Sequence, residues 1–171
     1  METKITVIPI AVDTKKLTPV KRELRSKNIL TLGTLHYPPN ADGIRWFANE
    51  VFPHILKRMP EVNLTIIGKN PPADFVQMAE DNPKSIRVTG YAPDLTPYFE
   101  SASMLVIPVR AGGGIRVRIL EGFARAMPVL TTVGLEGNEA KPGIDVLVED
   151  YALSFADAAI RLIEDEELQN Q

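Results

Sequence analysis

Short apolar runs alternate along the chain with longer segments in which apolar residues recur every three or four positions. The short runs predict strands buried in a parallel sheet, because they are apolar on both faces. They cover residues 28–34, 62–68, 85–90, 104–109, 128–133 and 145–150. The longer segments have helical spacing and predict helices between the strands. They cover residues 41–59, 72–82, 93–102, 115–126 and 151–168.

The first predicted helix, at residues 41–59, has clear helical spacing. Its apolar positions are Ile44, Phe47, Val51, Ile55 and Met59. Asn40 and Asp42 are candidate caps at its start, because short polar side chains can accept hydrogen bonds from the first backbone N–H groups. Pro53 predicts a kink or a broken turn, because proline removes a helical hydrogen bond. Trp46 is expected to lie in the core.

The alternation of strands and helices predicts a Rossmann-like, doubly wound α/β domain, with a parallel sheet of about six strands and helices on both faces. A chain of 171 residues is long enough for one such domain. Ligands of these sheets bind at the carboxyl ends of the strands, near the point where the strand order reverses. The loops after the first, third, fourth and fifth strands are therefore the candidate ligand loops. They span residues 33–40, 90–93, 110–114 and 134–139.

The least ordinary stretch is PVRAGGGIRVRILEGFARAMPVL, at residues 108–130. Three glycines precede a predicted helix that carries two arginines in or near its first turn. These residues are Gly112, Gly113, Gly114, Ile115 (the expected helix start), Arg116 and Arg118. Glycine lets backbone N–H groups approach a ligand closely, and both a helix N-terminus and a guanidinium group attract anions. The stretch is a candidate phosphate or diphosphate site; the alternative is a tight turn followed by solvated arginines.

Two further features bear on a nucleotide ligand. Glu121 lies farther along the same helix, where a carboxylate can accept hydrogen bonds from the two hydroxyls of a ribose; the alternative is a surface glutamate. Gly33 and Thr34 close the first strand, where glycine allows a phosphate or sugar near the backbone; the alternative is an ordinary strand-to-loop glycine. The G-x-G-x-x-G spacing of dinucleotide sites is absent, which counts against an NAD-dependent dehydrogenase.

Composition narrows the classes of function. A hydrophobic fraction of 44% and a charged fraction of 24% are typical of a soluble globular protein. A net charge of −3 does not favour a nucleic-acid partner. Cysteine is absent, which excludes disulfides and is compatible with a reducing compartment. No signal peptide or membrane-spanning run is visible, so a cytoplasmic location is expected.

Several polar residues are expected to have no catalytic role. His36 and His54 are too few for a histidine-rich metal site, and no Asp-x-Asp pair occurs, so we expect no metal and no cofactor. His36 and Tyr37 lie in a loop at the end of a strand, where they could reach a ligand, but they are expected instead to order the YPPN turn. The acidic run at residues 164–167 is expected to be a solvated helix end.

Several segments together resemble the C-terminal, donor-nucleotide-binding domain of group 1 (family 4) glycosyltransferases, which are retaining enzymes of the GT-B fold. VIPIAVDTKKLTP resembles the segment that leads into that domain, and LGTLHYPPNADGIRWFANEVFPHILKRMPEVNLTIIGKNPP resembles its first strand, helix and second strand. VTGYAPDLTPYFESASMLVIPVRAGGGIRVRILEGFARAMPVLTTVGLEG resembles the region of the family motifs GGG-T-R-x-K-I-L-E-A and G-x-P-V-V. The resemblance implies a lead-in segment at residues 1–20 and a donor-nucleotide-binding domain at residues 21–171, truncated at its C-terminus.

The resemblance implies roles for individual residues. Glu121 matches the second Glu of the family's E-x7-E motif and is expected to bind the ribose hydroxyls. Arg116 and Arg118 match basic positions near the diphosphate. They are the expected catalytic residues, since they would neutralise charge on the departing nucleoside diphosphate. The other expected contacts to the nucleotide-sugar are Gly33, Thr34, Lys69, Tyr91 (at the base), Gly112, Gly113, Gly114 and Ile115.

The chain also departs from the family pattern. Gly113 occupies the position of the first Glu of E-x7-E, which commonly contacts the donor sugar. The Arg and Lys pair that many members use for the diphosphate is incomplete, because only Lys69 is near. The glycine of the family's A-x-G-x-P-V turn is replaced within the segment Arg125–Met127.

The resemblance implies an enzyme that transfers a hexose from a nucleoside-diphosphate sugar, with retention of anomeric configuration. The acceptor, a sugar, lipid or other molecule, is expected to bind to a missing N-terminal domain, so the fragment alone is expected to be inactive. Any membrane association would come from that missing part. Two alternatives stay open: a non-catalytic Rossmann-like binding or scaffold module, and a GT-B-fold UDP-sugar epimerase.

Overall fold

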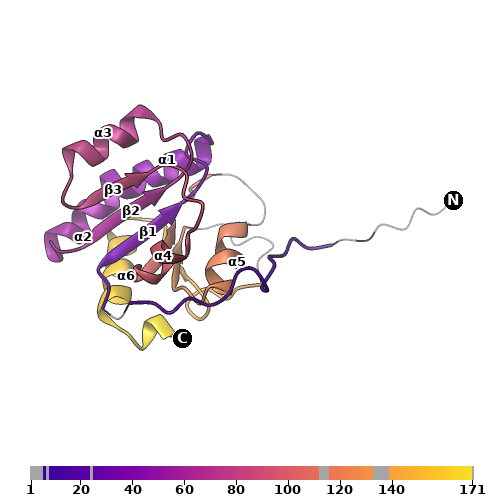
Figure 1. Ribbon diagram of the computed structural model, residues 1–171. Helices are drawn as coiled ribbons and strands as arrows, with labels where there is room; N and C mark the ends of the chain where they lie inside the picture. The colour runs from indigo at the N-terminus through magenta and orange to yellow at the C-terminus, as the bar shows by residue number, and fades with distance from the viewer. Residues whose placement is uncertain (1–5, 7, 24, 112–115, 133–138, 171) are drawn as a thin grey trace.

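Parallel strands form one sheet in the described part of the chain (Figure 1). The structure is a computed structural model, and it describes residues 6, 8–23, 25–111, 116–132 and 139–170. The strands are β1 (Asn28–Leu32), β2 (Asn63–Ile67), β3 (Ile86–Thr89), β4 (Met104–Ile107), β5 (Val129–Thr131) and β6 (Leu147–Val148). Their order is β3-β2-β1-β4-β5-β6, and every neighbouring pair is parallel. The predicted Rossmann-like α/β domain with a six-stranded parallel sheet is confirmed.

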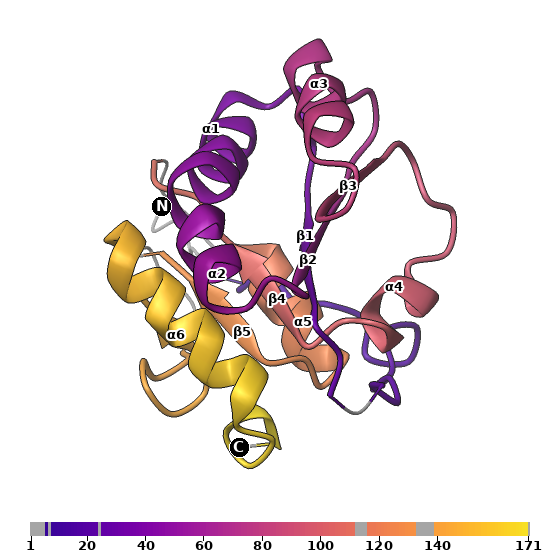
Figure 2. The ribbon, with the colours of Figure 1, turned by 90° about the vertical axis from the view of Figure 1, so that its left-hand side faces the viewer.

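Helices cover both faces of this sheet (Figure 2). The helical elements are α1 (Pro38–Trp46), a π-helical turn (Phe47–Val51), α2 (Phe52–Arg58), α3 (Ala73–Asp81), α4 (Thr96–Glu100), α5 (Val117–Ala124), α6 (Ala152–Glu164) and a 3₁₀ turn (Leu168–Asn170). Side chains of α1, α2, α3 and α6 pack on one face, and side chains of α4 and α5 pack on the other. No helix in the described ranges is long and apolar enough to cross a membrane.

The strand order reverses beside β1, in the middle of the sheet. From β1 the chain moves outward through β2 to β3, and it then returns to β4 on the other side of β1. Ile29 of β1 is therefore paired with both Leu64 of β2 and Met104 of β4. The carboxyl ends of β1 and β4 flank the crevice in which open sheets of this type bind their ligands.

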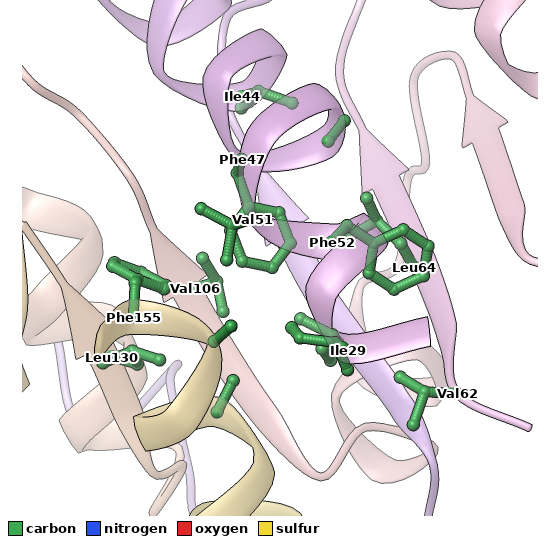
Figure 3. Close-up of a cluster of buried hydrophobic side chains, with 14 of the residues drawn as sticks. Ile29, Ile44, Phe47, Val51, Phe52, Val62, Leu64, Val106, Leu130 and Phe155 are labelled. Carbon is green, nitrogen blue, oxygen red and sulfur yellow. The ribbon is translucent and has the colours of Figure 1, made fainter. Parts of the chain in front are cut away.

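A large cluster of buried apolar side chains lies between the sheet and helices α1, α2 and α6 (Figure 3). Successive residues of β1 point to opposite faces, so Ile29 belongs to this cluster and Leu30 to the cluster on the other face. Phe155 of α6 packs edge-to-face on Trp46 and Phe47, with ring centroids 5.5 and 5.6 Å away. Trp46 is buried, as predicted. These rings join α6 to the end of α1.

The predicted helix at residues 41–59 consists of two helices joined by a π-helical turn. α1 already begins at Pro38, so the predicted caps Asn40 and Asp42 are wrong, because both residues lie inside the helix. Proline is favoured in the first turn, where its missing N–H has no helical partner. Pro53 likewise lies in the first turn of α2. The predicted break near Pro53 is confirmed, and the wide turn before it is the form that the break takes.

The C-terminus of α5 is closed by a Schellman motif around a residue other than glycine. The N–H of Ala126 donates to the carbonyl of Phe123 (2.9 Å), and the N–H of Met127 donates to the carbonyl of Gly122 (3.0 Å). Ala126 has a φ of 55°, a left-handed conformation that is usually filled by glycine. α5 therefore ends in the left-handed conformation that usually requires glycine, although the residue there is alanine.

We expect Ala126→Gly to raise the free energy of unfolding by about 0.5–1 kcal/mol. The left-handed conformation costs alanine about 1–2 kcal/mol, and the freedom of glycine in the unfolded chain offsets about 0.4–1 kcal/mol of the gain. Ala124→Gly, in the last turn of α5, is the paired control and should lower stability by about 1 kcal/mol. Urea unfolding followed by circular dichroism measures both changes. If both variants change the free energy of unfolding in the same direction, Ala126 is not strained in the wild type.

Arg22 joins the segment before β1 to the C-terminal 3₁₀ turn. Its guanidinium donates to Oε1 of Gln169 (2.6 Å) and to Oδ1 of Asn170 (2.9 Å), and partial burial lowers the pKa of Arg22. Nearby, the N–H of Val20 donates to the carbonyl of Arg125 (3.0 Å). The described residues before Val20 are mostly exposed, and the earliest of these described residues lie away from the sheet (Figure 1). The domain boundary at residue 20 stays a prediction.

Candidate functional site

A pocket of about 220 Å³ lies at the carboxyl ends of β1 and β4, where the strand order reverses. Four segments meet there: the end of β1, the start of α1, the end of β4 and the start of α5. The lining residues are Thr31, Leu32, Tyr37, Pro39, Asn40, Ile44, Ile107, Pro108, Val109, Ala111, Arg116, Val117 and Arg118. The pocket is therefore at the place where the fold predicts a ligand.

Close packing between α1 and the end of β4 forms one wall of the pocket. A Cβ atom added at Gly43 would lie 2.0 Å from the carbonyl oxygen of Pro108, so only glycine allows this approach. On the other side of β4, the hydroxyl of Thr131 donates to the carbonyl of Ile107 (2.8 Å). The end of β4 is thus held between α1 and β5.

Two arginines lie where α5 begins, and both line the pocket. Arg116 is the N-cap residue, in an extended conformation, and the first helical residue is Val117 rather than the expected Ile115. Arg118 donates a hydrogen bond to Oε2 of Glu121 within an ion pair. The side chains of Arg118 and Glu121 are 40% and 23% exposed. The structure thus brings the three predicted charged residues together, with Glu121 behind Arg118 and outside the pocket lining.

The first four residues of α1 offer no free N–H group to the pocket. Pro38 and Pro39 have none, because their nitrogens are part of the proline ring. The N–H groups of Asn40 and Ala41 both donate to the carbonyl of Tyr37, at 3.1 and 3.0 Å. This helix start therefore differs from those that bind phosphate through backbone N–H groups. Tyr37 and Asn40 line the pocket instead.

Four other predicted site residues lie at the same edge of the sheet but outside the pocket lining. Gly33 follows β1, and its N–H donates to the carbonyl of Ile67 (3.0 Å); the next residue, Thr34, is exposed. Lys69 follows β2 and is exposed, and Tyr91 follows β3 and is 74% exposed. Outside the described residues lie Gly112, Gly113, Gly114 and Ile115. Their place in the site stays a prediction, as do the roles of the other residues.

Two arginines that are adjacent in sequence to pocket residues contact side chains of α1 and α3. Cζ of Arg110 lies 5.2 Å from the ring centroid of Trp46. Nη2 of Arg45 donates to Oδ1 of Asp74 (3.1 Å), and the contact between these side chains raises the pKa of Arg45 and lowers the pKa of Asp74. Both partners are partly exposed, so the pair adds little stability. Among the described residues, no group of three or more His, Cys, Asp or Glu could hold a metal ion.

Two of the four candidate ligand loops, at residues 33–40 and 110–114, contribute described residues to the pocket lining. The loop at residues 90–93 does not line this pocket, and residues 134–138 lie outside the described part of the chain. The candidate loop at residues 33–40 contains Tyr37 and Asn40. Tyr37 does order the turn, because its N–H donates to the carbonyl of Thr34 (3.0 Å), but it also lines the pocket. The pair of prolines before Asn40 was the available signal, since it marks the true start of the helix.

A parallel sheet with helices on both faces and a pocket at its switch point defines an open α/β domain of the Rossmann-like class. The family model of the group 1 glycosyl transferases matches residues 26–165, and the chain belongs to this family. An uncharacterized 44.6 kDa protein in the cps region of Klebsiella pneumoniae is 26% identical over 143 residues. The match covers 80% of this chain and 37% of that protein, so the chain spans little more than a third of this curated relative.

Solved structures of glycosyltransferases have the same fold. The C-terminal domain of LpcC, a group 1 family protein of Francisella tularensis, has a TM-score of 0.74 at 19% identity. That match covers 94% of this chain and 91% of the solved one. TarM of S. aureus, in a complex that includes UDP and alpha-GlcNAc-glycerol, has a TM-score of 0.71 at 17% identity, with 90% of this chain and 31% of TarM covered. The predicted likeness to the C-terminal domain of a GT-B glycosyltransferase is confirmed.

Proposed function

We propose that this chain is the donor-binding half of a retaining hexosyltransferase that uses a nucleoside-diphosphate sugar. The observation that carries the proposal is the presence of Arg116 and Arg118 in the switch-point pocket of a group 1 glycosyl transferase chain. Two guanidinium groups beside one pocket suit a diphosphate, because they donate charge-assisted hydrogen bonds to its oxygens. The UDP in the complex of the similar TarM supports the same class of donor.

In this proposal the charged residues have separate tasks. Arg116 and Arg118 neutralise the negative charge that grows on the diphosphate as its bond to the sugar breaks. Glu121 accepts hydrogen bonds from the ribose hydroxyls, and Arg118 orients it through Oε2. The arginines supply the positive charge for the leaving group, so the reaction needs no metal ion. Tyr91, exposed at the end of β3, contacts the base.

The acceptor binds to an N-terminal domain outside this chain. The K. pneumoniae relative is much longer than its match to this chain, which supports a larger whole protein. Donor and acceptor therefore meet only when both domains are present. The chain alone binds the nucleotide but does not transfer the sugar.

Arg118→Ala should weaken the binding of UDP more than the binding of uridine. The lost contact to a charged group is worth about 1.5–3 kcal/mol, or roughly 10- to 150-fold in Kd, and only UDP has the diphosphate. Glu121→Gln should weaken both ligands alike by about 1–3 kcal/mol, because both contain the ribose. Isothermal titration calorimetry measures the affinities, and added salt should weaken UDP more than uridine. If the site prefers guanine, the same comparison is made between GDP and guanosine.

Arg161→Ala, on the exposed side of α6, is the control for loss of a positive charge and should leave both affinities unchanged. If Arg118→Ala weakens the binding of UDP and of uridine equally, Arg118 does not bind the diphosphate. Unchanged affinities in Glu121→Gln would remove Glu121 from the ribose site. If no nucleotide binds saturably to the wild type, the chain is a scaffold module rather than a donor-binding domain.

A further inference from the structure

We propose that Arg110 and Thr132 are positioning residues: they hold the pocket segment, residues 108–111, between α1 and β5, so that the pocket is formed before a nucleotide binds. This inference rests on the proposed use of a nucleoside-diphosphate sugar. Pro108, Val109 and Ala111 line the pocket, whereas Arg110 and Thr132 do not. In this arrangement, Arg110 and Thr132 affect the nucleotide through the segment that they hold.

Strand pairing alone does not fix the pocket segment. Ile107 and Thr131 form the last pair in the register of β4 with β5, and the next residue, Pro108, has no N–H group to donate. Two hydroxyl groups add hydrogen bonds at this point: Thr131 donates to the carbonyl of Ile107 (2.8 Å), and Thr132 donates to the carbonyl of Val109. Thr132 is only 2% exposed, so water cannot easily replace its hydrogen bond. The Thr132 hydroxyl therefore ties the middle of the segment to the end of β5.

α1 holds the same segment from the other side. Cζ of Arg110 lies 5.2 Å from the ring centroid of Trp46, and a guanidinium group is attracted to the face of an indole ring. Trp46 is itself buried, and it packs edge-to-face on Phe155 of α6. Next to Arg110, the carbonyl of Pro108 lies against Gly43, where a Cβ atom would come within 2.0 Å of its oxygen. The partners of the segment on this side are thus buried parts of the core.

These contacts order the pocket segment in the absence of a ligand. The segment supplies part of the pocket lining itself, and from Ala111 a short stretch of chain leads to Arg116 at the start of α5. A segment that is already ordered loses little conformational freedom when a ligand binds, and such a loss would lower the affinity. Release of the segment should therefore raise the Kd of a nucleotide although no group that contacts the nucleotide has been removed.

The first test removes the hydroxyl of Thr132 and then restores it. Calorimetry on this chain measures the Kd of UDP and of GDP, and the comparison uses the one that the wild type binds more tightly. Thr132→Val should raise this Kd roughly three- to ten-fold, as expected for one hydrogen bond, whereas Thr132→Ser should stay within about two-fold of wild type. Thr65→Val is the matched control, because Thr65 is buried in β2, donates to Oδ1 of Asn28 (2.8 Å) and lies outside the pocket lining. It should lower stability about as much as Thr132→Val and leave the Kd unchanged.

The second test follows the segment without a ligand, through Trp46. Trp46 is the single tryptophan of the chain, and the guanidinium of Arg110 lies over its ring. Acrylamide should quench its fluorescence more strongly in Arg110→Ala than in the wild type. Thr132→Val should also increase the quenching, because a released segment takes Arg110 away from the ring, whereas Thr65→Val should not.

Arg110→Ala should also weaken nucleotide binding without changing its response to salt. The Kd should rise roughly two- to five-fold, as expected for the loss of one exposed cation–π contact. The salt dependence of the Kd should remain that of the wild type, because the guanidinium of Arg110 is held by Trp46 and does not line the pocket. A residue that contacts the diphosphate directly would reduce the salt dependence when it is replaced.

The outcomes separate this inference from the proposed function. If the wild type binds a nucleotide but Thr132→Val keeps the wild-type Kd, the positioning role of Thr132 is overturned and the proposed function stands. An equal rise of the Kd in Thr65→Val overturns it as well, because the effect would then come from a general loss of stability. For Arg110, unchanged quenching of Trp46 or a reduced salt dependence in Arg110→Ala overturns the positioning role. A wild type that binds no nucleotide overturns the proposed function and this inference together.

Discussion

Phe155→Ala should lower the free energy of unfolding by about 3–5 kcal/mol, as is typical for the loss of a buried aromatic side chain. Phe155 is fully buried, and its ring centroid lies 5.5 Å from that of Trp46 and 5.6 Å from that of Phe47. Alanine would leave a cavity between α6 and the end of α1, and the edge-to-face contacts would be lost as well. This change is a large part of the about 5–15 kcal/mol that stabilises a typical domain.

Leu153→Ala, on the exposed side of the same helix, is the control for this substitution. Leu153 is 63% exposed, so the change should stay within about 0.5 kcal/mol. Urea unfolding can be followed by circular dichroism and by the fluorescence of Trp46, the single tryptophan of the chain and a direct neighbour of Phe155. A loss for Phe155→Ala no larger than that for Leu153→Ala would contradict the packing of α6 on α1.

The sheet was predictable because a parallel sheet buries both faces of its strands. Ile29 and Leu30 point to opposite faces, yet both are fully buried, so the strand is one continuous apolar run in the sequence. The same pattern, alternating with helical spacing, predicted the doubly wound order. The strand ends were less predictable: the run at residues 28–34 contains a strand that ends at Leu32. The predicted run extends through Gly33 and Thr34, whereas strand pairing stops at Leu32, where the chain turns toward the pocket.

Helix starts were harder to predict because several residue types favour the same positions. Asn40 and Asp42 are good caps when only local preference is considered. Pro38 instead begins α1, because proline fits the first turn without the loss of a hydrogen bond. This earlier helix start also affects the candidate site, because Asn40 is a helical residue that lines the pocket rather than a cap.

Only one side of the candidate site could be predicted residue by residue. Arg116 and Arg118 were identifiable because two arginines beside consecutive glycines are unusual in a local sequence. Tyr37 and Asn40 are marked only by the two prolines between them, and they are far from the arginines along the chain. They share a pocket with them because β1 is paired with β4, which is a property of the strand order. The loop at residues 33–40 was predicted as a ligand loop, but which of its side chains line the pocket became visible only in the structure.

Gly43→Ala should destabilise the protein, although alanine is the better helix former. In the interior of an exposed helix this change would add about 1 kcal/mol of stability. At Gly43 the added carbon would lie 2.0 Å from the carbonyl oxygen of Pro108 and 2.7 Å from its carbonyl carbon. These are backbone atoms, which cannot rotate away as a side chain can. α1 must therefore move away from β4, and we expect a net loss of about 1–3 kcal/mol, the usual cost of overpacking.

The same movement should change the shape of the pocket at the switch point, because Ile44 and Pro108 both line it. The affinity of Gly43→Ala for nucleoside diphosphates should therefore fall at temperatures at which circular dichroism still shows a folded protein. Gly90→Ala is the comparison for stability: nothing lies within 4 Å of a Cβ atom added there, so the change should stay within about 0.5 kcal/mol. If Gly43→Ala and the wild type have the same urea midpoint of unfolding, α1 can move away from β4 without a loss of stability. A loss of stability with unchanged nucleotide affinity would mean that α5 alone determines diphosphate binding, whatever the position of α1.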